Sequence, residues 1–311
     1  MSSNILEPGE IENAAMTPPF VQLPPLDMFS KRAARLETLA KGHPMAAYLQ
    51  LLAKICHAQQ SVLDAPPSQP ELDAHTLAGA LQHDMLPLAV DTLLHNTGWQ
   101  VQLDALLNTF IKQNNDLPEA VQQALQRLQL ADIKQRNIWA TALLSGRFSA
   151  VPGALTPFLG AALQLAWRYW LKSINAEDIR EREDQTECPC CGSLPVTGVI
   201  RHRRPIDGVR YLLCSLCATE WHYVRLKCSH CLNTRALDYL HFDDSPHGVK
   251  AEVCPECNTY LKQLYLEIAP SGEALSADLA SLDLDLALTE KNLQRRAPNL
   301  LLAPGHEGET N

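Results

Sequence analysis

The segment Cys188-Pro-Cys-Cys-Gly192 opens a cysteine array that closes with Cys254-Pro-Glu-Cys257. The array holds eight of the ten cysteines of the chain in four Cys-x-x-Cys pairs, which are Cys188/Cys191, Cys214/Cys217, Cys228/Cys231 and Cys254/Cys257. The first and second pairs are as far apart as the third and fourth, so the second half of the array repeats the first. The match extends to Asp207-Gly208-Val209-Arg210 and His247-Gly248-Val249-Lys250, which precede the second and fourth pairs. The array is therefore a tandem duplication of one small unit.

The spacing of the cysteines is typical of a metal site. Two thiolates three residues apart on a tight turn supply half of a tetrahedral site for zinc or iron, and a second such turn supplies the other half. A unit of about 40 residues is too small to be stable through burial alone, so a metal cross-link has a clear purpose. Gly192 and Asn258 follow a pair where a left-handed backbone is expected, whereas Ala218 and Leu232 do not fit that pattern. Disulfides are disfavoured because nothing marks the chain as secreted.

The repeat assigns the first pair to the second and the third pair to the fourth, which predicts two sites of four cysteines each. An interleaved arrangement, in which the two middle pairs share one metal, remains open. Four thiolates leave no free coordination position, as structural zinc or electron-transfer iron requires. The predicted metal ligands are Cys188, Cys191, Cys214, Cys217, Cys228, Cys231, Cys254 and Cys257.

Other side chains near the array are expected to be bystanders. Cys190 lies inside the first knuckle, where it is either an extra small turn residue or a thiol that could exchange with a ligand. With eight cysteines completing two sets, the nearby histidines are not needed as ligands, although they could influence a ligand from outside the site. These histidines are His202, His222, His230, His241 and His247.

Composition limits the function classes. The 311 residues carry a formal net charge of −9, which argues against a general nucleic-acid-binding protein. The basic cluster Arg201-His202-Arg203-Arg204 is expected at a solvated loop tip. The segment from Met1 to Met16 has no apolar core, so it is not a signal peptide. The uncharged run from Phe148 to Trp167 contains prolines and glycines and is expected to form a buried helix, so we predict a cytoplasmic protein without a membrane span.

The part of the chain before the cysteines has the pattern of an all-α domain. We expect residues 1–20 to be disordered and residues 21–175 to form six or seven helices. Asp116 and Glu119 resemble a capping box that opens the stripe from Val121 to Leu128. Cys56 and the tryptophans Trp139, Trp167 and Trp170 fit core positions, and His57 fits the surface. The expected helices include residues 29–40, 45–56, 73–82, 99–112, 133–144 and 156–171.

Residues 176–187 form a charged linker with six acids and two arginines. Beyond it we expect the first metal module at 188–226, the second at 227–268, and a C-terminal helix with a tail at 269–311. Short β-rich runs at 196–200, 210–213, 220–224, 236–242, 249–253 and 260–268 predict strands. A knuckle, a hairpin and a second knuckle is the layout of a zinc ribbon or rubredoxin. The predicted fold class is an all-α domain followed by two tandem rubredoxin-like or zinc-ribbon-like modules and a C-terminal helix over 275–293.

The sequence contains no catalytic motif. It has no Gly-rich phosphate loop, no His-Glu-x-x-His and no serine on a strand-to-helix elbow. We therefore expect no enzyme activity. Three function classes remain: an accessory protein that binds a client, a zinc-ribbon protein that binds nucleic acid, and a small electron-transfer protein.

The combination of four pairs behind a helical domain resembles the formate dehydrogenase accessory protein family FdhE over about residues 21–300. The likeness rests on a few segments, and the array of four pairs is specific where a single pair would not be. The segments are Leu23-Pro-Pro-Leu-Asp-Met-Phe29, Arg32-Ala-Ala-Arg-Leu36, Gly42-His-Pro44, Tyr48-Leu49, Cys188-Pro-Cys-Cys-Gly192-Ser-Leu-Pro195, Cys214-Ser-Leu-Cys217, Glu220-Trp221, Cys228-Ser-His-Cys231, Cys254-Pro-Glu-Cys257 and Tyr260-Leu261-Lys262.

The resemblance implies a cytoplasmic maturation factor without turnover of its own. It implies binding to the catalytic subunit of respiratory formate dehydrogenase before that subunit is exported. It also implies two rubredoxin-like iron ions, one on each set of four cysteines, with zinc as the alternative metal, especially after purification in air. Neither the chemical action on the client, nor the client-binding surface, nor the oligomeric state follows from the sequence.

Overall fold

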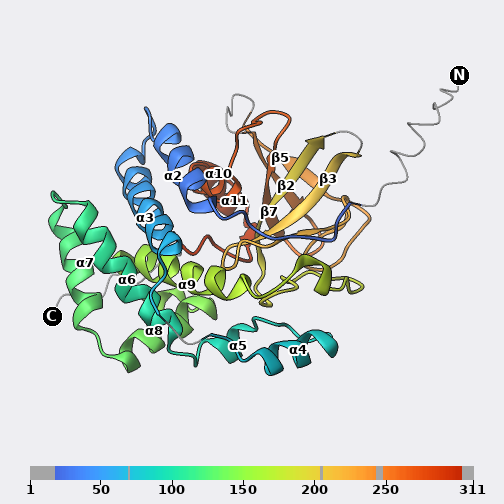
Figure 1. The fold of residues 1–311 in the computed structure, drawn as a ribbon. Helices are drawn as coiled ribbons and strands as arrows, with labels where there is room; N and C mark the ends of the chain where they lie inside the picture. The colour runs from blue at the N-terminus through green and yellow to red at the C-terminus, as the bar shows by residue number, and fades with distance from the viewer. Residues whose placement is uncertain (1–17, 69–70, 204–205, 243–247, 303–311) are drawn as a thin grey trace, which may run out of the picture.

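The computed structural model describes residues 18–68, 71–203, 206–242 and 248–302 (Figure 1). Helices fill the part of the chain before the cysteines, as the spacing of apolar residues predicted. Asp73 and Asp132 each accept a hydrogen bond from a backbone amide of the following helix, so each acts as an N-cap. The helices are α2 (Met28–Leu39), α3 (Ala46–Asp64), α4 (Ala74–Gln82), α5 (Val90–Leu93), α6 (Gly98–Gln113), α7 (Glu119–Leu130), α8 (Ile133–Leu144) and α9 (Thr156–Leu171).

Helix α9 is the centre of the helical part, and all of its residues are buried. It packs against α3, α6 and α8. No helix within the described residues has both the length and the apolarity that crossing a membrane requires. Trp139, Trp167, Trp170 and Cys56 lie in the core around α9, which confirms their predicted packing role.

The C-terminal segment passes directly over α9. A methyl group at Gly160 would overlap the carbonyl oxygen of Leu300, so glycine is required where the two backbones meet. The segment is held by two further contacts: the Tyr48 hydroxyl donates to the carbonyl of Leu301 at 2.5 Å, and the Leu300 amide donates to the hydroxyl of Ser215 at 3.0 Å. Leu300 and Leu301 therefore cover the core of the helical region.

Within the described residues, the strands join into one mixed sheet in the order β1-β4-β3-β2-β7-β6-β5, with β8 beside β7. The duplicated halves are joined where β2 pairs with β7 in parallel, with Val199 opposite Leu264. The remaining pairs, apart from β7 with β8, are antiparallel. The strands are β1 (Val21–Gln22), β2 (Pro195–Arg203), β3 (Ile206–Cys214), β4 (Glu220–His222), β5 (Asp238–Leu240), β6 (Val249–Cys254), β7 (Thr259–Tyr265) and β8 (Gln294–Arg295).

The fold class is confirmed: a helical region precedes two clusters of four cysteines among short strands, and helices follow. The helices and the first cysteine cluster share one hydrophobic core, and the second core lies between the sheet and the C-terminal helices. The charged segment 176–187 also contacts the body, since Ile179 is buried and the Trp221 indole donates to the carbonyl of Gln185 at 3.2 Å. The domain boundaries given above stay predictions.

The start of the described chain lies on the sheet. Strand β1 pairs with β4, and the Tyr211 hydroxyl donates to the carbonyl of Pro19 at 2.9 Å. Sequence analysis placed residues 1–20 outside the folded part. Residues 1–17 lie outside the described ranges, and Pro19 and Phe20 contact the first module. Strands as short as β1 carry too little periodicity to be found from sequence.

Two helix predictions were wrong. The capping box at Asp116 does not form, because α7 begins at Glu119 with Pro118 at the N-cap position. The single helix expected over 275–293 is two helices, α10 (Ala274–Leu279) and α11 (Leu282–Glu290). The buried Lys262 ammonium explains the break, because it takes the carbonyl oxygens of Asp278 and Ser281 as acceptors at 2.7 and 3.2 Å.

The prediction that residues 201–204 form a solvated loop tip was also wrong for its first residue. Arg201 belongs to β2, its side chain is 27% exposed, and it forms an ion pair with Glu220 at 2.5 Å. The pairing of β2 with β3 extends through residues 201–203, so the positive charge of Arg201 lies on the sheet. Arg204 lies outside the described residues.

Candidate metal centre

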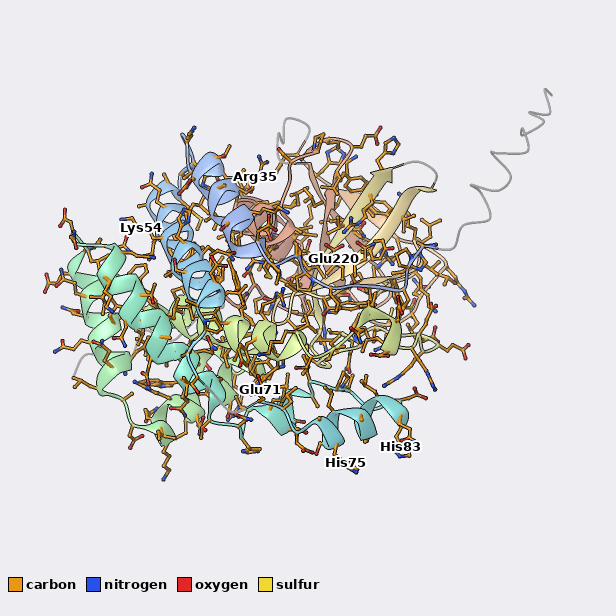
Figure 2. All side chains as sticks on the ribbon, in the orientation of Figure 1. Arg35, Lys54, Glu71, His75, His83 and Glu220 are labelled. Atoms are coloured by element: carbon orange, nitrogen blue, oxygen red, sulfur yellow. The ribbon has the colours of Figure 1, made fainter. Side chains whose placement is uncertain are left out.

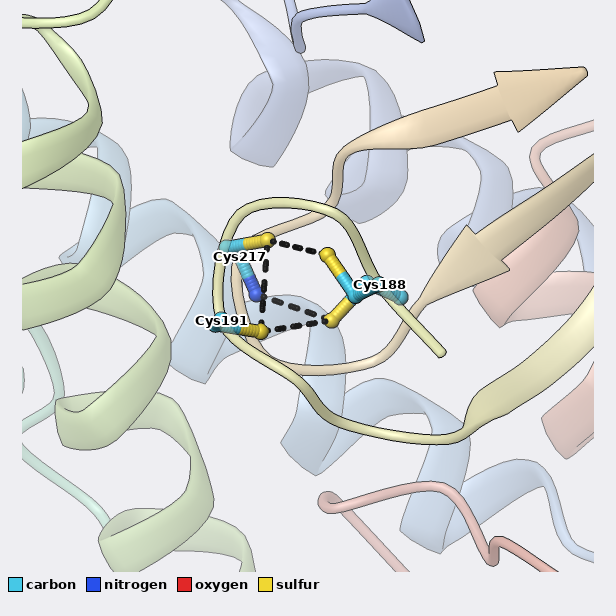
Figure 3. A group of neighbouring side chains, drawn as sticks. Cys188, Cys191 and Cys217 are labelled. Carbon is cyan, nitrogen blue, oxygen red and sulfur yellow. Dashed lines mark hydrogen bonds between the residues drawn. The ribbon is translucent and has the colours of Figure 1, made fainter. Parts of the chain in front are cut away.

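The first cysteine cluster is enclosed by protein. Cys188, Cys191, Cys214 and Cys217 are each at most 1% exposed. The sulfur atoms of Cys188 and Cys217 are 3.5 Å apart, as are those of Cys191 and Cys214, and 3.8 Å separates Cys191 from Cys217 (Figure 3). Four sulfurs around zinc at about 2.3 Å lie about 3.8 Å from one another. The cluster therefore has the size of a tetrahedral metal site.

The second cluster has the same composition and a more open position. Sγ–Sγ distances are 3.8 Å from Cys228 to Cys257 and 3.6 Å from Cys231 to Cys254. Cys228 and Cys254 are buried, Cys257 is half-buried and Cys231 is exposed. In each cluster the ligand atoms lie within 4.8 Å of one another, so each set of four could bind one metal ion. The thiols are grouped as adjacent pairs, and the interleaved arrangement is not the one observed.

All four knuckles have the same backbone turn. The amide of the residue after each of the first and second pairs donates to the carbonyl of the first cysteine, from Gly192 to Cys188 and from Ala218 to Cys214. Gly192, Ala218, Leu232 and Asn258 all have positive φ, between 52° and 80°. Ala218 and Leu232 therefore adopt the conformation that sequence analysis did not expect of them. A side chain with positive φ is unfavourable, and the turn geometry imposes it.

Hydrogen bonds to sulfur prepare both clusters for negative charge. The amides of Leu216 and Cys217 point at Cys214 Sγ from 3.3 and 3.5 Å, and the amide of His230 points at Cys228 Sγ from 3.4 Å. Burial opposes charge on Cys214, but the three neighbouring thiols and the Cys217 amide lower the pKa of Cys214 well below its usual value. The first cluster can therefore hold one thiolate, at Cys214, while its other three thiols are still protonated.

The second cluster shows the same effect on Cys254. Burial raises the pKa of this thiol. The amides of Cys257 and Glu256 and the Cys231 thiol lower the pKa by more than burial raises it, so that it lies at about 7. By contrast, burial raises the pKa of Cys228 to about 12. A bound dication would favour the thiolate form of all four residues, because metals bind thiolates and release the protons.

Two threonines next to the clusters were missed by sequence reasoning. The Thr219 hydroxyl lies 3.1 Å from Cys217 Sγ, and the Thr259 hydroxyl lies 3.0 Å from Cys257 Sγ. Both threonines occupy the second position after the last cysteine of a module, so they correspond to each other in the repeat. This recurrence was the signal that could have identified them. The Cys217 thiol donates to the Thr219 hydroxyl, and in the Cys257–Thr259 contact either group could be the donor, so each threonine is placed to influence a cysteine of its cluster.

The bystander residues lie outside the two sets. Cys190 is fully buried, and its thiol is not one of the four sulfurs of the first set. Its carbonyl accepts a hydrogen bond from the Leu88 amide at 2.8 Å, so the first knuckle is also attached to the helical region. No histidine within the described ranges joins either cluster, and His247 lies outside those ranges. That the eight cysteines ligate metal stays a prediction, which the donor set and its spacing support.

The difference in exposure predicts two rates of metal loss. When a chelator is added to protein carrying two metals, we expect the metal of the second cluster to leave at least about tenfold faster, because the first is reached only after the core opens. The release is followed with a colorimetric chelator. A Cys254→Ser, Cys257→Ser variant should lack the fast phase and keep the slow one. A single phase for both metals would contradict the assignment.

Comparison with known proteins agrees along the whole chain. Three family models match: "FdhE, N-terminal" at residues 17–184, "FdhE, central domain" at 187–225 and "FdhE, C-terminal domain" at 226–302. The chain is 59% identical over 307 residues to "Protein FdhE homolog" of Stutzerimonas stutzeri, covering 99% of this chain and 100% of the relative. It is 37% identical over 302 residues to "Protein FdhE" of an Escherichia coli strain, covering 97% of this chain and 96% of the relative.

A solved structure is similar over nearly the same extent. The crystal structure of the FdhE protein from Pseudomonas aeruginosa matches with a TM-score of 0.86 and 47% sequence identity. The match covers 92% of this chain and 100% of that one. Together with the two four-cysteine clusters and the helical region before them, these similarities show that the chain belongs to the FdhE family.

Proposed function

We propose that this protein is a cytoplasmic accessory protein for the maturation of respiratory formate dehydrogenase, and that it binds the immature catalytic subunit of that enzyme. Membership of the FdhE family along the whole chain is the observation that carries the proposal. The two clusters support it, since four cysteines close a coordination sphere and leave no position at which a substrate could be activated. On this proposal the protein has no turnover of its own and acts by binding.

We further propose that each cluster holds one iron ion on its four cysteines. Amide groups that point at sulfur, as those of Leu216 and Cys217 do at Cys214, would stabilise thiolates around such an ion. Iron in a tetrahedral thiolate site supplies one-electron redox chemistry, whereas zinc does not change oxidation state. The four cysteines of each cluster would hold the ion, and the burial of the first cluster would exclude water from it.

The client proposal is tested by co-purification. We expect the formate dehydrogenase catalytic subunit to be retained by the tagged protein under anaerobic conditions, with a cross-linker to preserve a weak complex. The catalytic subunit of an unrelated molybdenum enzyme serves as the matched control and should not be retained. Equal recovery of both subunits, or of neither, would reject a specific client.

The metal proposal has its own measurement. Protein purified without air should contain about two iron ions per chain, by analogy with one metal for each set of four thiolates. Its absorption spectrum should show sulfur-to-iron charge-transfer bands that bleach on reduction. Two zinc ions and a colourless protein from anaerobic cells would make the clusters structural and would contradict the iron proposal.

A further inference from the structure

A cleft lies between helix α2 and the sheet, and Leu213 and Ala218, which flank the Cys214–Cys217 knuckle, are among its lining residues. Its volume is about 820 Å³, which is within the range of pockets that bind drug-sized ligands or short peptides. The segment Gln22–Pro25 and the loop 270–274 form its ends. Figure 2 shows Arg35 on α2 and Glu220 on the sheet, the two elements that face each other across it.

The floor of the cleft is apolar. Val199, Leu213 and Leu264 line it from β2, β3 and β7, and each is at most 5% exposed. Leu266 continues the same surface beyond β7. Val199 and Arg201 are two residues apart on β2, so both project from one face of the sheet. A ligand lying on this floor would therefore meet apolar side chains first and a guanidinium group at the edge.

The walls of the cleft carry a local excess of positive charge in an acidic chain. Lys31, Arg32, Arg35 and Arg201 line it, together with two carboxylates. Lys31 pairs with Asp27, which lies outside the lining, at 2.9 Å, so Arg35 is the lining cation that has no ion pair within the described residues. Both carboxylates are already engaged, because Glu273 accepts from Arg32 at 3.1 Å and Glu220 accepts from Arg201 at 2.5 Å. A positive surface of this kind favours a negatively charged partner.

Two guanidinium groups in the cleft each have a nitrogen without an acceptor. Within the described residues Arg35 forms no ion pair, and its Nε has no hydrogen-bond partner. The Nε of Arg201 is also buried without a partner in that part of the chain, although another of its nitrogens bonds Glu220. Buried donors normally have acceptors, and arginine pairs best with a carboxylate. The residues of α2 that line the cleft recur every three or four positions and so lie on one face of the helix. They are Met28, Lys31, Arg32, Arg35 and Thr38.

We propose that this cleft binds an acidic, apolar peptide segment of a partner protein, with the apolar side chains on the floor of Val199, Leu213 and Leu264 and a carboxylate at Arg35. The inference rests on the proposed function, in that the partner is the catalytic subunit of the client enzyme. The proposal gives a role to the segment Leu23-Pro24-Pro25 and to α2, which the metal-site proposal leaves without one.

The test uses charge reversal with a matched control. Arg35→Glu should weaken binding of the purified catalytic subunit by about tenfold or more, because the carboxylate would then face a like charge. Lys54→Glu makes the same charge change on the neighbouring helix α3, outside the cleft, and should leave the affinity unchanged (Figure 2). Arg35→Gln should give a smaller loss. Binding is measured by biolayer interferometry under anaerobic conditions, and thermal melting checks that each variant is folded.

A cross-link then identifies the bound segment. A photoreactive residue at Thr38, on the cleft wall, should capture a client peptide rich in apolar and acidic residues, whereas the same residue at Leu130, which is 78% exposed on α7, should not. Replacing the captured carboxylate by lysine in the client should restore binding to Arg35→Glu.

The outcomes separate the two proposals. If the wild-type protein does not bind the subunit, the proposed function fails and this use of the cleft fails with it. If it binds but is indifferent to Arg35→Glu and gives no cross-link from Thr38, the cleft proposal alone is overturned. A small anion that is retained by wild-type protein and lost in Arg35→Glu, with client binding unchanged, would also overturn it.

Discussion

Replacing Cys214 and Cys217 together by serine should remove one bound metal per chain and unfold the helical region. The first cluster is part of the core that holds the helices, so its loss removes a cross-link from the centre of the molecule. A structural metal site of this type contributes on the order of 10 kcal/mol, which is comparable with the whole stability of a domain. Metal content by plasma mass spectrometry and thermal unfolding by circular dichroism measure the two effects.

The second cluster provides the matched control for this prediction. Serine at Cys254 and Cys257 should also remove one metal, yet leave the helical region folded, because this cluster borders the solvent and its cysteines are not part of the core that holds the helices. The ligands that remain loaded in the first variant should be Cys228, Cys231, Cys254 and Cys257. Loss of both metals from either variant would show that the clusters do not form independently.

The second large effect is expected at a buried ion pair that connects the two modules. Arg210 on β3 binds both carboxylate oxygens of Glu252 on β6 at 2.6 and 2.7 Å, and the two side chains are 0% and 4% exposed. Arg210 also donates to the carbonyls of Val224 and Lys227, and Lys227 precedes Cys228. Arg210→Met should destabilise the protein by about 3 to 5 kcal/mol, because it leaves a buried charge unpaired. Urea unfolding measures the loss.

The duplication supplies the control for Arg210. Lys250 occupies the corresponding position in the second module, where its ammonium lies 5.0 Å from the centre of the Tyr265 ring and forms no ion pair with the described carboxylates. Lys250→Met should cost less than about 1 kcal/mol, as expected of an exposed or partly exposed cation. Adding Glu252→Leu to Arg210→Met should recover much of the stability, since it removes the unpaired carboxylate. A similar loss in the Arg210 and Lys250 variants would contradict this interpretation of the ion pair.

The features predicted well from sequence are those that depend on local spacing. The Cys-x-x-Cys pattern and its repetition along the chain led to the two groups of four that the structure contains. The helical period of the apolar residues located α8 and α9 at their observed bounds. The apolar, β-branched runs located strands β2 to β7, because alternation of side chains is also a local property.

The features missed are those that depend on residues distant in sequence. Lys262, which lies on the sheet, interrupts the C-terminal helix. The sequence of residues 275–293 contains no signal of this contact. The parallel pairing of β2 with β7 and the Arg210–Glu252 pair join the two modules, although the repeat alone described them as separate. The cleft beside Arg35 likewise arises from four segments that meet only in the folded chain.

The passage of Leu300 over Gly160 bears on when the protein can fold during its synthesis. The helix that forms the centre of the core is complete once Leu171 has been made, but the segment that covers it follows only after both metal modules have been translated. A nascent chain on the ribosome therefore exposes this apolar surface until the segment around Leu300 has been made. The helical region should gain its final protection from proteolysis only after that segment has left the ribosome, and a protein truncated before Leu300 should depend on chaperones to stay in solution.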